Sequence, residues 1–239
     1  HFKKYGMSGS IILLDFHAFF PSASHEIIAA RHRQFILNDS LRKIGDTIVQ
    51  STGLTVGVPL GVETSQVEMI AYPSDLDNEI KSQLSAKRAG HYMDDYIVMV
   101  PPNRNPREIL SIIRKKAKEL RLTISEGKTR IIPFGKPFRY CKAKYIITQT
   151  GKVYTTCNRD SIKRDRKKFK AFKKMLENGE MTYENIWTAA NSALSYLERF
   201  NNHRQLLKLR RLFYALFGFS PEKKINFDMA DIFRGGNGK

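Results

Sequence analysis

The sequence predicts an α+β protein with a ferredoxin-like domain followed by a mostly helical segment. Apolar runs and helical patterns through about residue 133 follow the order β-α-β-β-α-β, the split ferredoxin-like pattern. From residue 159 onward, three further helical patterns follow one another. With 239 residues and 41% hydrophobic content, the chain is long enough for one core, or for a core and a small subdomain.

The first strand is predicted over 10–15, where the continuous apolar run Ile11–Leu14 is typical of a buried strand. Ser22 and Ser24 offer N-caps for the helix that follows, which leaves Asp15 at the strand end without a capping role. A Gly- and Pro-punctuated loop separates the next helices. The elements predicted up to this point are helices over 23–37 and 39–51, the loop over 53–61 and one helix over 62–84.

A strand, a tight turn and a returning strand are predicted over about 89–100, with Pro101 and Pro102 ending the hairpin. Asn105-Pro106 begins a helix that runs to about Leu120. The remaining predictions are a strand at one or both ends of 122–132, a hairpin of 138–147 with 151–155, and helices near 159–177, 182–200 and 203–217.

Two adjacent carboxylates, Asp94 and Asp95, occupy the predicted tip of the 89–100 hairpin. Like charges repel at short range, and a hard divalent cation such as Mg²⁺ removes that cost. The ferredoxin-like order places Asp15 on a strand beside this tip. Three acids on two strand ends predict a two-metal site for phosphoryl or nucleotidyl transfer. A solvated turn is the alternative.

Charge indicates a polyanionic partner. The chain has 41 Lys and Arg against 23 Asp and Glu, a formal charge of +18. The stretch Lys163–Lys174 holds eight basic residues and one acid, with Phe169 and Phe172 interleaved, as on a helix with one packed side and one phosphate-facing side. A basic protein without a nucleic-acid role is one alternative. A membrane-surface helix is the other, but its apolar face is too thin for firm insertion.

The sequence argues against a membrane-spanning, a secreted disulfide-rich or a zinc-binding protein. No run approaches the roughly 20 apolar residues of a membrane span, and no secretory signal is visible. Cys141 and Cys157 are too few for a disulfide framework, so an intracellular, cytoplasmic setting fits. The His residues show no zinc spacing, and His17, His25 and His91 are interpreted as ordinary polar or packing residues.

Taken together, these motifs resemble the palm and thumb of a bacterial reverse transcriptase, and most closely those of diversity-generating retroelements. The resemblance covers nearly the whole chain. It divides the chain into a palm over 1–137, a primer-grip-like hairpin over 138–158 and a basic helical thumb over 159–239. The matching motifs are Asp15–Phe20, Gly57–Gln66, Tyr92-Met93-Asp94-Asp95, Leu122–Thr129 and, more weakly, Phe138–Cys141.

The resemblance implies an RNA-directed DNA polymerase that uses two Mg²⁺ ions, replaceable by Mn²⁺. Asp15, Asp94 and the carbonyl of Phe16 would bind the metals with support from Asp95, and Lys128 would sit near the leaving pyrophosphate, unless it is a surface lysine. Phe20 would be the gate that excludes a ribose 2′-hydroxyl, with a core Phe as the alternative. The residues implied at the nucleotide are Leu60, Gly61, Ser65 and Gln66, and those implied at primer and template are Tyr92, Met93, Phe138, Arg139, Tyr140, Lys163, Arg166, Lys167, Lys170 and Lys174.

Leu60 departs from the commoner family pattern, which has Gln at this place, and Gln66 stands where Pro is usual. Losing an amide beside the forming base pair removes a hydrogen bond that penalises misfit, which predicts error-prone copying. The resemblance also implies dNTPs, an RNA template, a DNA or RNA primer and no membrane; an accessory protein or a further chain is common in such systems. The resemblance also implies a fingers segment before the first acid, and with Asp15 near residue 1 we expect this segment to be largely absent from this chain.

Other functional classes remain open at this point. One is a phage-defence reverse transcriptase that makes untemplated or atypical DNA. Another is a non-catalytic RNA-binding scaffold with a polymerase-like fold. A third is a basic partner-binding domain with an incidental Asp pair.

Overall fold

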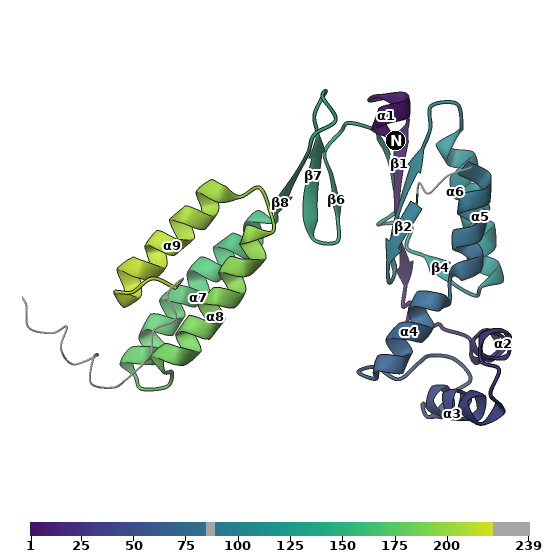
Figure 1. Cartoon of the computed structure of the whole chain (residues 1–239), viewed down its shortest axis with the longest axis horizontal. Helices are drawn as coiled ribbons and strands as arrows, with labels where there is room; N and C mark the ends of the chain where they lie inside the picture. The colour runs from purple at the N-terminus through teal and green to yellow at the C-terminus, as the bar shows by residue number, and fades with distance from the viewer. Residues whose placement is uncertain (85–88, 222–239) are drawn as a thin grey trace, which may run out of the picture. The chain divides into compact units, whose positions relative to one another are not determined.

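The computed structural model describes residues 1–84 and 89–221. These residues form two compact units (Figure 1). The first comprises His1–Cys141 with Ile147–Lys152, and the second comprises, among the described residues, Lys142–Ile146 and 153–221. The end of the predicted thumb, residues 222–239, lies outside the described residues.

The sheet of the first unit is built around β1 (Ser10–His17). On one side β1 pairs antiparallel with β3 (Asp95–Val100), which in turn pairs with β2 (Ala89–Tyr92). On the other side β1 pairs with β4 (Thr123–Ile124) and β5 (Arg130–Pro133). The order β2-β3-β1-β4 is that of the predicted ferredoxin-like pattern, which is confirmed.

Two helices, α5 (Ser74–Leu84) and α6 (Pro106–Glu119), cover one face of this sheet (Figure 1). Asn105 caps α6 by accepting a hydrogen bond from the backbone N–H of Arg107. In β3 burial alternates, so Tyr96 and every second residue after it are buried against the helices. The opposite face of the sheet therefore receives Asp95, and with it Asp15 of β1.

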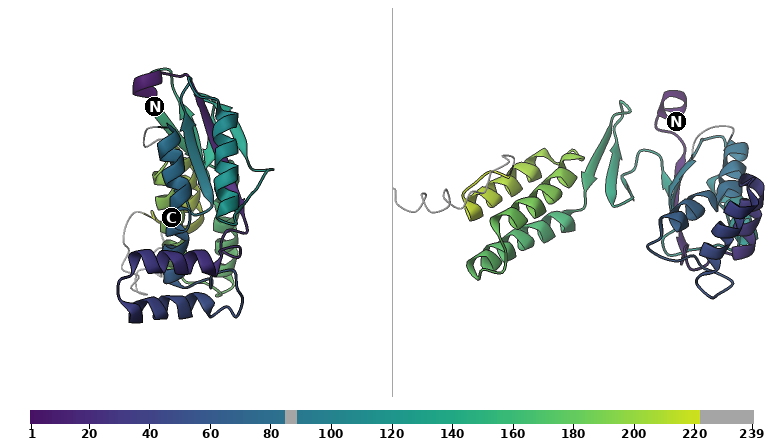
Figure 2. Two further views of the ribbon diagram at one scale, coloured as in Figure 1. Left: turned by 90° about the vertical axis from the view of Figure 1, so that its right-hand side faces the viewer. Right: turned by 60° about the horizontal axis from the view of Figure 1, so that its bottom comes forward.

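A second helical group consists of α2 (His25–Phe35), α3 (Asp39–Gln50) and α4 (Glu63–Ala71), with α2 and α3 lying side by side (Figure 2). The single helix predicted over 62–84 is wrong: α4 ends at Ala71 and α5 begins at Ser74. Pro73 explains the break, because its ring cannot donate the helical hydrogen bond and clashes with the preceding turn. The short helix α1 (Phe2–Tyr5) was not predicted.

The hairpin predicted over 138–155 has three strands instead of two. They are β6 (Phe138–Tyr140), β7 (Ala143–Ile147) and β8 (Val153–Cys157). Cys141 and Lys142 have φ angles of 46° and 66°, and this left-handed pair turns the chain back between β6 and β7. The turn between β7 and β8, at 149–151, has Gly151 at φ 79°.

The second unit contains three helices, α7 (Arg159–Glu177), α8 (Tyr183–Glu198) and α9 (His203–Phe217), close to the predicted bounds. Both Figures 1 and 2 show them running alongside one another. Phe169 and Phe213 meet edge to face in their core, with ring centroids 5.3 Å apart. Gly218 ends α9 in a left-handed cap. Among the described residues, no helix is long and apolar enough to cross a membrane.

Candidate active site

The three predicted acids come together at one end of the sheet. Asp15 of β1 lies directly opposite Asp95 of β3 in the antiparallel register. Cross-strand partners have Cβ atoms about 5 Å apart. Asp94 lies in the two-residue turn between β2 and β3, and its carbonyl accepts a hydrogen bond from the backbone N–H of Phe16 at 3.2 Å. The strand ends therefore hold all three carboxyl groups in one place.

The electrostatics of this cluster favour a bound cation. Burial raises the pKa of the Asp95 carboxyl, and the nearby charges of Asp94 and Asp15 raise it further, against an opposing effect of Lys128. Asp15 is itself buried, at 7% exposure. Within the described residues, no three His, Cys, Asp or Glu side chains stand in ready metal-binding geometry. The carboxylate chemistry nevertheless fits a hard divalent ion, which would offset the repulsion.

Lys128 joins the acids through a turn that is fastened to Asp15. The backbone N–H of Ser125 donates to the Asp15 carbonyl at 2.8 Å, and the Lys128 N–H donates to the Ser125 carbonyl at 3.1 Å. The Lys128 ammonium then reaches Asp15 Oδ1 at 2.7 Å, a hydrogen bond that raises the pKa of the lysine. Ser125 Oγ donates to the same oxygen at 3.1 Å. A cation would share this carboxylate with Lys128.

A half-buried carboxylate supports the acid-bearing hairpin, by which we mean β2, β3 and the turn between them. From α5, Asp77 accepts a hydrogen bond from the Tyr96 hydroxyl at 3.1 Å, and its other oxygen lies 3.1 Å from His91 Nε2. The His91 ring stacks on Tyr96 with centroids 4.7 Å apart. The hydrogen bond to Asp77 raises the pKa of His91, although burial opposes it. Asp77 thus fixes the hairpin to the helix layer.

The tip of the hairpin is strained and exposed. Met93 has a φ of 53°, which costs a non-glycine residue about 1 kcal/mol and is typical of functional turns. Tyr92, a predicted primer contact, is 67% exposed. Tyr140 of β6 donates from its hydroxyl to the Asp95 carbonyl at 3.2 Å, so this predicted primer contact also positions an acid. The neighbouring Phe138 is buried, and Arg139 is exposed.

The loop over 57–61 lies against the residues that follow β1. The backbone N–H of Val58 donates to the Phe20 carbonyl at 3.2 Å, and that of Gly57 donates to the Ala23 carbonyl at 2.7 Å. Phe20 is partly buried and packs edge to face on Phe19. The predicted gate residue and the predicted nucleotide loop are therefore neighbours.

The four predicted nucleotide contacts differ in accessibility. Leu60 is 75% exposed, and Gln66 is also exposed. Gly61 has a φ of 83° with open space where a Cβ would be, so glycine suits a close backbone approach there. Ser65 is only 2% exposed inside α4, where core packing covers it. Its predicted contact with a nucleotide does not agree with this burial.

His32 of α2 connects α2 to α3 and α4 through hydrogen bonds. Its two ring nitrogens lie 2.7 Å from Asp46 Oδ1 on α3 and 2.6 Å from Glu68 Oε1 on α4. Burial lowers the pKa of His32, but the two carboxylates outweigh it and the pKa is raised. Cβ built on Gly45 would come within 3.0 Å of the His32 ring, so the helices meet closely here.

The predicted template contacts form a basic face along α7. Lys163, Lys167, Lys170 and Lys174 are exposed, and Arg166 is half-buried. They belong to the second unit, whereas the acids belong to the first.

Sequence reasoning missed four residues that shape the site: Ser125, Asp77, His91 as a paired residue, and His32. Ser125 stood inside a recognised motif, three residues before Lys128, and could have been singled out. The others could not, because Asp77 is 14 residues from His91, and Glu68 is 36 residues from His32.

A family model described as reverse transcriptase (RNA-dependent DNA polymerase) matches residues 1–172. The comparison with curated proteins found no match. Among solved structures, telomerase from Candida albicans, in complex with a TWJ fragment of telomeric RNA, matches with a TM-score of 0.55 and 10% identity over 98% of this chain and 43% of that chain. The Sicinivirus 3Dpol RNA-dependent RNA polymerase matches with a TM-score of 0.52 and 14% identity over 92% of this chain and 49% of that chain.

The chain therefore spans less than half the length of either solved chain. At such identities the likeness shows the fold alone. Together with the family match, it confirms the predicted fold class, a polymerase palm followed by a helical thumb.

Proposed function

The chain belongs to the reverse transcriptase (RNA-dependent DNA polymerase) family, and on that premise we propose that it extends a DNA or RNA primer with deoxynucleotides on an RNA template. The observation that carries this proposal is the cross-strand register of Asp15 and Asp95, with Asp94 in the adjoining turn. Two strand ends that hold three acids suit in-line phosphoryl transfer.

Asp15, Asp94 and the carbonyl oxygen of Phe16 would hold two Mg²⁺ ions, or Mn²⁺ in their place, with Asp95 in support. When bound, such ions activate the primer 3′-hydroxyl and neutralise charge on the triphosphate. Lys128 is already hydrogen-bonded to Asp15 and would deliver a proton to the leaving pyrophosphate. Phe20 would meet the sugar of the incoming nucleotide.

The loop over 57–61 and the basic face of α7 would contact the nucleic acid. Exposed Leu60 and Gln66 would border the forming base pair, with Gly61 allowing close approach. Tyr92 and Met93 would lie near the primer end. The lysines of α7 would bind phosphates without reading sequence. An accessory protein and a cytoplasmic, bacterial or phage setting are parts of the same proposal.

Error-prone copying of the kind associated with diversity-generating retroelements is proposed from Leu60. An apolar side chain there offers no hydrogen bond to penalise a misfit. Leu60→Gln should lower the error rate, measured by sequencing products made on one RNA template. An unchanged error spectrum would contradict the assignment. Because Leu60 is exposed, the substitution should leave the thermal stability unaltered.

The proposal is tested by primer extension on a defined RNA template with Mg²⁺ and dNTPs. Templated DNA should appear with the wild-type chain and disappear with Asp94→Ala. Asp39→Asn, which removes a surface acid on α3 whose side chain is 76% exposed, is the matched control and should remain active. Untemplated product would favour the phage-defence alternative. If the primer is not extended but the chain still binds RNA in a salt-sensitive way, the result would favour the non-catalytic RNA-binding scaffold.

A further inference from the structure

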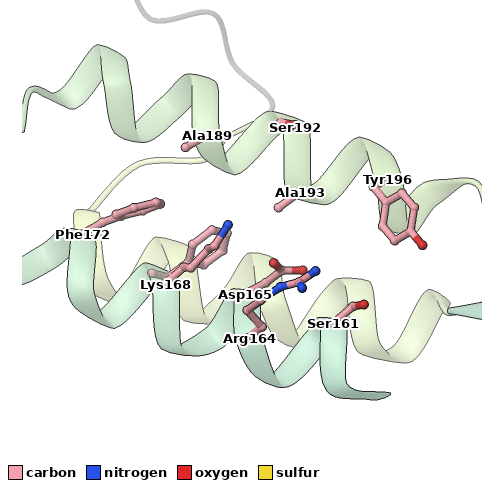
Figure 3. Close-up of a pocket in the computed structure, with 10 residues that line it drawn as sticks. Ser161, Arg164, Asp165, Lys168, Phe172, Ala189, Ser192, Ala193 and Tyr196 are labelled. Atoms are coloured by element: carbon pink, nitrogen blue, oxygen red, sulfur yellow. The ribbon is translucent and has the colours of Figure 1, made fainter. Parts of the chain in front are cut away.

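A pocket of about 300 Å³ opens between α7 and α8 in the second unit (Figure 3). That volume is at the lower end of pockets that hold small ligands. Its walls combine a carboxylate from Asp165, hydroxyl groups from Ser161 and Tyr196, and the ring of Phe172. Arg164 and Lys168 also line it and are exposed. The pocket contains none of the acids of the candidate active site.

Asp165 is the unusual member of this pocket. It is 8% exposed, and Figure 3 shows its carboxylate pointing from α7 toward α8. Across residues 1–84 and 89–221, no hydrogen bond or ion pair engages this carboxylate. Burial raises the pKa of the Asp165 carboxyl, with Arg164 and Lys168 opposing it. A buried acid without a partner is costly, and a ligand with N–H donors would offset that cost at Asp165.

The charges around Asp165 narrow the choice of ligand. A carboxylate only accepts hydrogen bonds, so the ligand must donate. A lone amine or guanidinium would satisfy Asp165 but would also meet the like charges of Arg164 and Lys168. A nucleotide satisfies both requirements, because its base donates N–H groups while its phosphate pairs with the two cations. Phe172 and Tyr196 offer aromatic surfaces against which a base can stack.

Guanine is the base that fits this acceptor best. Its N1–H and N2–H groups are adjacent and point the same way, so both can donate to the two oxygens of one carboxylate. Cytosine and adenine place an acceptor nitrogen beside their amino group, which a carboxylate repels. We propose that the pocket between α7 and α8 binds a single unpaired guanine of RNA, with Asp165 reading its Watson–Crick edge and Arg164 and Lys168 contacting its phosphate.

Fluorescence anisotropy with labelled oligouridylate that contains one central guanine or one central adenine tests this proposal on the full chain. In EDTA and without dNTPs, the guanine oligonucleotide should bind about tenfold more tightly, as expected for one bidentate base contact. Asp165→Asn should abolish that preference. Asp160→Asn, on the same helix but at its exposed first turn, is the matched control and should retain it.

Equal affinity of the wild-type chain for both oligonucleotides would overturn the proposal, as would a preference that survives in Asp165→Asn. Competition by an arginine-containing peptide that depends on Asp165, with no guanine preference, would overturn it in favour of a protein partner. Thermal melting shows that both variants are folded before binding is compared. Asp94→Ala should keep the guanine preference, so failure here is distinguishable from failure of the polymerase proposal.

Discussion

Replacing Asp77 with asparagine isolates the charge that fixes the acid-bearing hairpin to α5. In the wild-type protein, one carboxylate serves both the Tyr96 hydroxyl and His91. Burial raises the pKa of Tyr96, so the hydroxyl stays protonated and donates. Asparagine can still accept that hydrogen bond through its carbonyl oxygen. What it cannot do is pair with a protonated imidazole.

The cost of Asp77→Asn therefore depends on pH. The pKa of His91 is raised in the folded protein, mainly by its hydrogen bond to Asp77. The stabilisation from protonated His91 is thus fully present below the unfolded pKa of about 6.5, and it is lost as the pH rises through the folded pKa. A hydrogen bond to a charged group contributes about 1.5–3 kcal/mol. We expect Asp77→Asn to lower the free energy of hairpin opening by about 2 kcal/mol at pH 6 and by clearly less at pH 9.

Asp77→Ala should behave differently, because it leaves the Tyr96 hydroxyl without an acceptor in the core. An unsatisfied buried group costs about 1–3 kcal/mol at either pH. The free energy of opening would be measured by hydrogen exchange of the backbone amides of 89–100. Asp39→Asn is the control, because the Asp39 side chain is 76% exposed and its ion pair with Arg42, within one turn of α3, contributes little. An equal cost of Asp77→Asn at pH 6 and pH 9 would refute the reasoning.

Three further predictions concern the site and its surroundings. Lys128→Ala should lower kcat of primer extension about 100-fold. Lys128→Arg should not restore kcat, because arginine keeps the charge but does not give up a proton. Full activity of Lys128→Arg would limit Lys128 to an electrostatic role. Glu68→Gln should destabilise α2–α4 by about 2 kcal/mol at pH 6 and by less at pH 9, as measured by hydrogen exchange. The pKa of His32 is raised in the folded protein, so the stabilisation from protonated His32 is lost as the pH rises through this folded pKa. A larger loss of stability at pH 9 than at pH 6 would contradict this prediction. Lys163→Ala and Lys167→Ala should each reduce the slope of log affinity for single-stranded RNA against log salt by about 0.7, and an unchanged slope would remove them from the interface.

Patterns along the chain predicted the parts of the fold that depend on local chemistry. The apolar run of β1, the Asn105-Pro106 start of α6 and the three thumb helices all follow from capping and periodicity, and the structure has them. The errors occur where a local conformation overrides the pattern. Pro73 divides one predicted helix into α4 and α5. The left-handed residues Cys141 and Lys142 divide one predicted strand into β6 and β7.

The acids of the candidate site were predictable because Asp15 lies near the end of β1, Asp95 begins β3 and Asp94 lies in the turn before it, and element order places these two strands side by side. Their supports were not, because Asp77 and Glu68 act across distances that no periodicity encodes. The sequence also did not indicate which residues of a motif are buried. Ser65 and Leu60 sit in the same motif, yet one is 2% exposed and the other 75%.

The pairing of β1 on both of its edges limits where this chain can change in length. Because side chains alternate along a strand, one residue inserted between Ser10 and Asp15 would turn Asp15 toward the helices while Asp95 stayed in place. The sheet could persist with its acids on opposite faces. The same insertion in the turn at 149–151 would shift no paired acid. Length variation among natural variants of this chain should therefore gather in its turns, and β1 and β3 should keep a constant number of residues.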